Sequence, residues 1–179
     1  MTTELDVLRL VGERLSSAAV PFMLTGSFAL AYYSIPRMTR DLDLVIGLDE
    51  SAVPAVVRAF ERDFYIDADS VHEAVRSRRL FNLMHLESGI KVDLIVRKDA
   101  EFRHVEFARR QAVSFAGVTT WIVSREDLIL SKLAWARDAG SELQLRDVRS
   151  LLDAPTDLAY LRRWAPTLGV AGEREELLP

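Results

Sequence analysis

Two pieces of sequence decide the fold: LTGSFAL at residues 24–30 and DLDLVI at residues 41–46. In the second piece, Asp41 and Asp43 are two residues apart in an apolar run, so a β-strand would place both carboxylates on one face. Two neighbouring carboxylates repel each other and are costly to keep ionised without a cation between them. In the first piece, Gly26-Ser27 supplies a position without a Cβ atom and a hydroxyl, which suit a phosphate at the start of a helix. The two motifs together indicate a site for phosphate and metal.

A third carboxylate lies in IKVDLIV at residues 90–96. Alternation places the valines and Leu94 on one face of a strand and Asp93 on the other, beside Lys91. An aspartate in the middle of such a strand is unfavourable unless something pairs with it. If this strand lies next to residues 41–46, the three carboxylates converge. Oxygen ligands of this kind suit Mg²⁺, and the arrangement suits a two-metal in-line displacement at phosphorus.

The order of these motifs resembles the nucleotidyltransferase superfamily, whose members are DNA polymerase β-like. The resemblance implies that Gly26 and Ser27 bind the triphosphate of a nucleoside triphosphate. It implies that Asp41, Asp43 and Asp93 are the catalytic residues and the ligands of two Mg²⁺ ions, with Mn²⁺ as an alternative. Asp93 would also accept the proton of an attacking acceptor hydroxyl. In such a reaction pyrophosphate leaves and a nucleoside monophosphate is transferred.

Two charged residues stand out in the C-terminal part of the chain. Lys132 follows Leu128 by one helical turn, and Asp147 lies four residues from both Leu143 and Leu151, so both polar groups occupy apolar helix stripes. Three interpretations stay open: the lysine extends its ammonium to water, Asp147 forms a structural ion pair between helices with Lys132 or with an arginine, or both residues belong to the active site.

These residues are similar to the AbiEii-type branch of the superfamily, which contains bacterial toxin nucleotidyltransferases. The resemblance implies that Lys132 and Asp147 are nucleotide-binding residues. It also implies that Arg37, in the run PRMTR at residues 36–40, reaches a phosphate. The C-terminal part is shorter here than is usual in that branch, so the resemblance does not identify the acceptor.

Composition favours a compact globular chain. The 179 residues are 49% hydrophobic and 28% charged, and they include no cysteine, which excludes disulfides and thiolate zinc sites. The net charge of −4 argues against a large basic nucleic-acid footprint, although a local one stays open. No apolar run is long enough to span a membrane, and the acidic N-terminus lacks the basic start of a signal peptide. We therefore expect a cytoplasmic protein without membrane contact.

The hydrophobic pattern predicts a fold of mixed α/β (α+β) class. Helices are expected at 3–19, 28–33, 52–63 and 100–110, and strands at 22–24, 41–46, 80–86 and 90–96, with two more within 111–123. Residues 124–179 are expected to be helical. The prediction is a nucleotidyltransferase fold in one domain over 1–179, with a small mixed sheet flanked by helices in 1–123 and a helical part packed on it.

Three functions are compatible with these features. The first is an enzyme that transfers a nucleotide from a nucleoside triphosphate, such as ATP, to RNA, for example tRNA, as in toxin–antitoxin systems, where a cognate antitoxin protein would be a partner. The second is transfer to a small molecule, as aminoglycoside nucleotidyltransferases do. The third is a non-catalytic binding protein on the same fold. A basic groove beside Asp93 would favour the first, and an acidic pocket would favour the second.

Overall fold

The computed structural model describes residues 2–35 and 41–172. In this part of the chain one mixed sheet has the strand order β3-β4-β5-β2-β1-β7-β6. The strands are β1 (Phe22–Thr25), β2 (Leu42–Ile46), β3 (Phe64–Tyr65), β4 (Leu80–His85), β5 (Lys91–Val96), β6 (Gln111–Phe115) and β7 (Val118–Ile122). β2 pairs in parallel with β5 and antiparallel with β1, so the two strands that carry the aspartates are neighbours.

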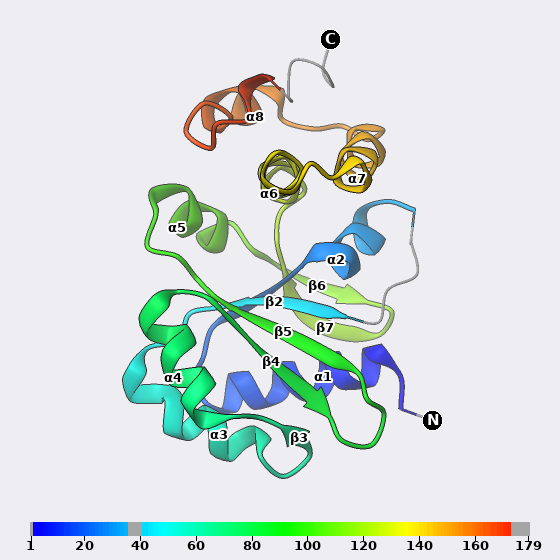
Figure 1. Cartoon of the computed structure of the whole chain (residues 1–179). Coiled ribbons are helices and arrows are strands. Elements are labelled where there is room, and N and C mark those ends of the chain that lie inside the picture. The colour runs from blue at the N-terminus through cyan, green and yellow to red at the C-terminus, as the bar shows by residue number, and fades with distance from the viewer. Residues whose placement is uncertain (1, 36–40, 173–179) are drawn as a thin grey trace.

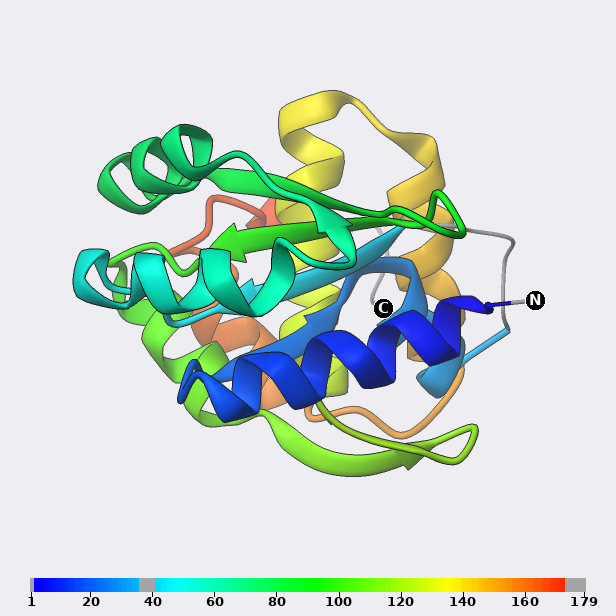
Figure 2. The same cartoon turned by 90° about the horizontal axis from the view of Figure 1, so that it is seen from below.

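Helices cover both faces of the sheet (Figures 1 and 2). α1 (Glu4–Ser17), α3 (Val53–Phe60) and α4 (Ala68–Ser77) lie on one side. α2 (Gly26–Tyr33), α5 (Glu101–Ala108), α6 (Arg125–Ala139), α7 (Glu142–Leu152) and α8 (Leu158–Trp164) lie on the other. A short 3₁₀ turn, η1 (Glu50–Ala52), precedes α3. Among the described residues, no helix is long and apolar enough to cross a membrane.

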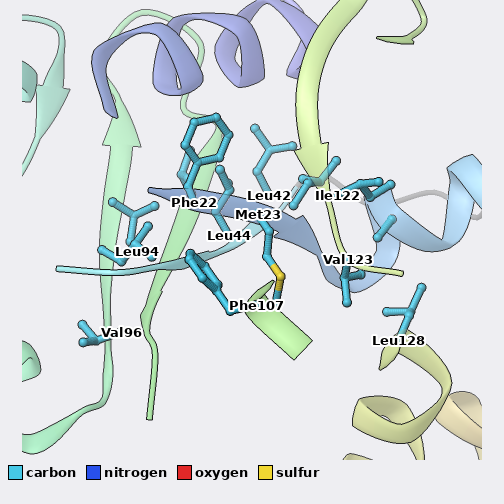
Figure 3. Packing of buried hydrophobic residues seen from close by; sticks show 14 of the residues in the cluster. Phe22, Met23, Leu42, Leu44, Leu94, Val96, Phe107, Ile122, Val123 and Leu128 are labelled. Atoms are coloured by element: carbon cyan, nitrogen blue, oxygen red, sulfur yellow. The ribbon is translucent and has the colours of Figure 1, made fainter. Parts of the chain in front are cut away.

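The buried core follows from strand alternation. In β2 the residues Leu42, Leu44 and Ile46 are buried, while Asp43 and Val45 between them are partly exposed. Phe22, which pairs with Ile46, packs against Gly12 of α1, so this face of the sheet looks toward α1. The opposite face looks toward α5 and α6. Figure 3 shows core residues from β1, β2, β5 and β7 together with Phe107 of α5 and Leu128 of α6.

The predicted elements are confirmed in order and type, with three differences. β2 begins at Leu42, so Asp41 precedes the strand rather than lying in it. The segment 64–79 forms β3 and α4, neither of which the sequence analysis predicted. Up to residue 170, the helical C-terminal part consists of three separate helices, because left-handed Gly140 ends α6 and a non-helical stretch precedes α8. The fold is the mixed α/β class expected, with helices packed on the sheet.

Candidate active site

One row of side chains crosses four neighbouring strands on the face toward α6. Thr25 of β1 pairs with Asp43 of β2, Asp43 pairs with Asp93 of β5, and Asp93 pairs with Asn82 of β4. Because strands in a sheet lie about 4.8 Å apart, this register places the two aspartates side by side. Asp41, two residues before Asp43, is exposed at the entrance to β2. The structure therefore brings together the strand aspartates that the sequence analysis selected.

Asp93 is held by two donors. Lys91 donates from Nζ at 3.0 Å to its carboxylate, and the Asn82 side-chain amide donates to Oδ1. Both partners come from the same sheet face, Lys91 from β5 itself and Asn82 from β4. The Lys91 pairing explains how a charged residue is tolerated in mid-strand, and it raises the pKa of Lys91 through that hydrogen bond. Sequence alternation indicated Lys91, whereas Asn82 was missed.

The surroundings of Asp43 disfavour its ionised form. Burial, the nearby Asp93 and then Asp41 raise its pKa from 3.8 to about 6, against a smaller opposing effect of Lys132 and Lys91. A carboxylate that is partly desolvated beside two like charges gains more than an ordinary one from a bound cation. This is the physical condition under which a divalent metal ion stabilises a site.

Gly26 leaves room for the Asp43 side chain. A Cβ atom at position 26 would lie 2.0 Å from Asp43 Oδ2, and Gly26 has a φ of +63°, which L-residues rarely adopt. Glycine is therefore required here twice, once by the backbone and once by the carboxylate that packs over it. The Gly-Ser pair and the Asp-x-Asp motif are thus in direct contact.

The N-terminus of α2 points its first turn at this site. Thr25, the N-cap residue, makes no side-chain hydrogen bond to the turn, and Ser27 is buried in it. Backbone N–H groups at a helix start attract phosphate oxygens through hydrogen bonds and the helix dipole. Gly26 and Ser27 lie at the start of α2, and their role in phosphate binding stays a prediction. Arg37 lies outside the described residues.

Lys132 and Asp147 form a buried ion pair between α6 and α7. Lys132 Nζ donates to Asp147 Oδ2 at 2.7 Å and to Gln144 Oε1 at 2.9 Å. Lys132 is 3% exposed, so the interpretation that its ammonium reaches water is wrong. The same lysine lines a cavity with Gly26 and Asp43. The pair therefore joins α6 to α7, and its lysine also lies beside the aspartate site.

A pair of variants separates these two roles of Lys132. Asp147→Ala would leave the Lys132 ammonium without its carboxylate in a buried place, and we expect a loss of about 3–5 kcal/mol in the free energy of unfolding. The double variant Lys132→Met/Asp147→Leu should recover most of that loss, because apolar side chains of similar size replace the pair. Urea denaturation measures the stability. If the double variant also keeps full transferase activity, Lys132 has no role in nucleotide binding.

The cavity beside this pair has a volume of about 230 Å³. Thr25, Gly26 and Asp43 line part of it, and residues of α6 line another part. Charged and polar residues that the sequence analysis did not select also line it, among them Arg97, Lys98, Arg103, Glu106 and Ser131. Glu106 follows Phe102 by one helical turn, so the two residues share the buried face of α5. This spacing could have identified Glu106 from the sequence.

The carboxylates fit a hard divalent ion in their chemistry. Oxygen donors at Asp41, Asp43 and Asp93 are of the kind that bind Mg²⁺. Within residues 2–35 and 41–172, however, no three His, Cys, Asp or Glu side chains stand close enough to hold a metal as they are. The Asp93 carboxylate accepts hydrogen bonds from Lys91 and Asn82, and it keeps further lone pairs with which it can bind a metal ion.

Comparison with solved structures places the fold in a class. The antibiotic-resistance factor ANT(2'')-Ia superposes with a TM-score of 0.63 at 14% identity, covering 97% of this chain and 96% of that chain. An antigenic nucleotidyltransferase-like protein from Paracoccidioides brasiliensis gives 0.56 at 19% identity, with 93% and 90% covered. The lincosamide antibiotic adenylyltransferase LnuA gives 0.52 at 12% identity, with 81% and 94% covered. The fold is that of nucleotidyltransferases.

A sequence match identifies one family within this class of folds. Residues 9–163 match the family described as nucleotidyl transferase AbiEii toxin, Type IV TA system. The chain belongs to this family and is a nucleotidyltransferase. No curated protein sequence matches it.

Proposed function

We propose that the chain transfers a nucleoside monophosphate from a nucleoside triphosphate to a hydroxyl of RNA, with tRNA as the first candidate, in a reaction that requires Mg²⁺. The observation that carries the proposal is the row of Asp43 and Asp93 beside the start of α2. It combines carboxylates that favour a cation with backbone donors that favour phosphate.

Each residue has a distinct role in this proposal. The start of α2, with Ser27, binds the phosphates, and Lys132 neutralises part of their charge. Asp41, Asp43 and Asp93 would hold Mg²⁺ or Mn²⁺, which when bound supplies charge neutralisation at the phosphates and polarises the acceptor oxygen. Asp93 takes the proton of the acceptor hydroxyl, the acceptor oxygen bonds to the α-phosphorus, and pyrophosphate leaves with the electron pair of the broken bond.

The groove beside Asp93 is neither the basic groove nor the acidic pocket considered above, and its apolar lining is what supports RNA as the acceptor. Among the residues that the structure describes, it is lined by Tyr65, Leu80, Asn82 and Met84, and by Lys91 as the one basic side chain. Tyr65, Leu80 and Met84 are large and exposed, which is unusual for one face of a sheet. Asp67, the one acid that lines it within residues 2–35 and 41–172, is used to cap α4 through Ser70. An apolar, aromatic groove with a lysine suits an unstacked nucleobase better than a polycationic aminoglycoside.

Transfer of radiolabel from each α-³²P nucleoside triphosphate tests the proposal. With Mg²⁺ and purified tRNA we expect label in the RNA, and none after Asp43→Asn. Tyr65→Ala should raise KM for RNA by roughly fivefold to a hundredfold, because one stacked base contributes about 1–3 kcal/mol, without changing KM for the nucleotide. Tyr32→Ala, an exposed tyrosine on α2, is the matched control. Label found only in kanamycin or lincomycin would overturn the RNA assignment.

The family context suggests a protein partner. The AbiEii description refers to a Type IV toxin–antitoxin system. We therefore propose that a cognate antitoxin counteracts the activity of this chain. Expression of the chain alone should slow bacterial growth, and the Asp43→Asn variant should not, as growth curves would show.

A further inference from the structure

A polar network around the buried Glu106 lines the same cavity as Asp43. Arg103 Nη1 donates to Glu106 Oε2 at 2.8 Å and to Ser131 Oγ at 2.7 Å, and the Ser131 hydroxyl donates to Glu106 Oε1 at 2.6 Å. Glu106 is 2% exposed, and both of its carboxylate oxygens are used. The network therefore fixes the guanidinium of Arg103 from α5 against α6.

Only part of the guanidinium is used by this network. Within residues 2–35 and 41–172, Arg103 makes hydrogen bonds only through Nη1, and Nε and Nη2 donate to no protein group. The side chain remains 28% exposed and lines the cavity. A planar guanidinium held on one side presents its other donors in a fixed direction, which is the geometry of bidentate recognition.

Apolar side chains make up much of the cavity lining, and Arg97 and Lys98 also line it. Val45 of β2 and Ile95 of β5 form its floor, and Leu128 and Trp135 of α6 face them. Flat heterocycles bind between such surfaces, and a volume of about 230 Å³ accommodates a nucleobase with part of its ribose. Because the cavity is continuous with Gly26 and Asp43, a nucleoside attached to phosphates there would enter it.

We infer that Arg103, positioned by Glu106 and Ser131, selects the base of the donor nucleotide by binding two adjacent hydrogen-bond acceptors on its edge. This inference rests on the proposed function, because it assumes that the triphosphate lies at the start of α2. Guanine offers O6 and N7 side by side, and cytosine offers O2 and N3. Adenine places an amino donor beside N7, and uracil places an N–H between its two carbonyls, so each leaves one arginine donor unpaired.

Isothermal titration calorimetry of the four nucleoside triphosphates with Mg²⁺, without acceptor, tests this selection. We expect GTP or CTP to bind roughly ten- to a hundredfold more tightly than ATP and UTP. Arg103→Lys keeps the charge but not the fork of donors, so it should remove this difference. Inorganic tripolyphosphate with Mg²⁺, which has no base, should bind wild type and variant equally. Arg76→Lys, on the surface of α4, is the matched control and should keep the preference.

The outcomes separate the two proposals. Equal affinity for all four nucleotides in the wild type, or a preference that persists after Arg103→Lys, overturns base selection by Arg103 while tripolyphosphate binding upholds the phosphate site. Failure of the four nucleotides and of tripolyphosphate to bind overturns the proposed function and this inference with it. If Arg103→Lys does not fold, the double variant Arg103→Met/Glu106→Leu replaces the whole pair and is expected to lose the preference in the same way.

Discussion

Replacing Asp43 with asparagine should abolish nucleotide transfer and, without divalent metal, make the chain more stable. The amide keeps the shape of the side chain but removes the charge that a metal and the phosphates require. We expect turnover to fall by at least about a thousandfold, a larger loss than removal of one hydrogen-bond donor causes. Incorporation of labelled nucleotide into the acceptor measures this loss. Retained turnover would contradict the assignment of Asp43.

The gain in stability follows from the raised pKa of Asp43, about 6 against 3.8. A carboxyl whose pKa is higher in the folded chain favours folding below the unfolded value and loses that contribution as pH rises through the folded value. Metal-free wild type should therefore lose about 1–2 kcal/mol between pH 4 and pH 7, after allowance for the partial exposure of the group.

Thermal unfolding in EDTA at several pH values checks this dependence. At pH 7, Asp43→Asn should unfold about 3–6 °C above wild type, and the difference should vanish near pH 4. Asp49→Asn, at an exposed acid outside the site, is the control and should follow wild type. A variant that is less stable than wild type at pH 7 would show that the ionised Asp43 carboxylate does not destabilise the folded chain.

Gly26→Ala should have the second large effect. The new Cβ atom would lie 2.0 Å from Asp43 Oδ2, so either the start of α2 or the carboxylate must move. We expect turnover to fall by roughly a hundredfold, as misplacement of about 1 Å can cause, and stability to fall by about 2–4 kcal/mol from backbone strain and the clash together. Turnover and urea denaturation measure the two losses.

Gly89→Ala separates the clash from the backbone penalty. Gly89 has a similar φ of +68°, but a Cβ atom there meets nothing within 4 Å. This variant should lose only about 1 kcal/mol and keep its activity. If the two variants behave alike, the contact between Gly26 and Asp43 is not what requires glycine.

The sequence predicts the parts of this protein that depend on local pattern. Alternation in residues 41–46 and 90–96 is strict, because one face of each strand is buried in the core, and it correctly gives the faces of Asp43 and Asp93. Convergence of the carboxylates required these two strands to lie side by side. They do so, in parallel, with Asp43 opposite Asp93. The metal and nucleotide roles of these residues stay predictions.

What the sequence did not reveal depends on contacts between distant segments. Ser131 bonds to Glu106 across 25 residues, and polar residues in helices are usually solvated, so neither was selected. α4 was missed because Asp67, Asp69 and Ser70 at its start indicate a loop, although Asp67 in fact caps the helix. The Lys132–Asp147 pair was predicted as one of three alternatives. The packing of α6 on α7 shows the pair, and an active-site role of the two residues stays a prediction.

Activity depends on correct strand pairing, because the site is the row Thr25–Asp43–Asp93–Asn82 across neighbouring strands. A slip of one residue between β2 and β5 would turn Asp93 into the core and bring a valine or leucine to the surface in its place. A chain with that error would bind neither cation nor phosphate, however compact it became. Metal and nucleotide therefore stabilise only the correctly paired sheet, and their presence during refolding should increase the yield of native protein by mass action.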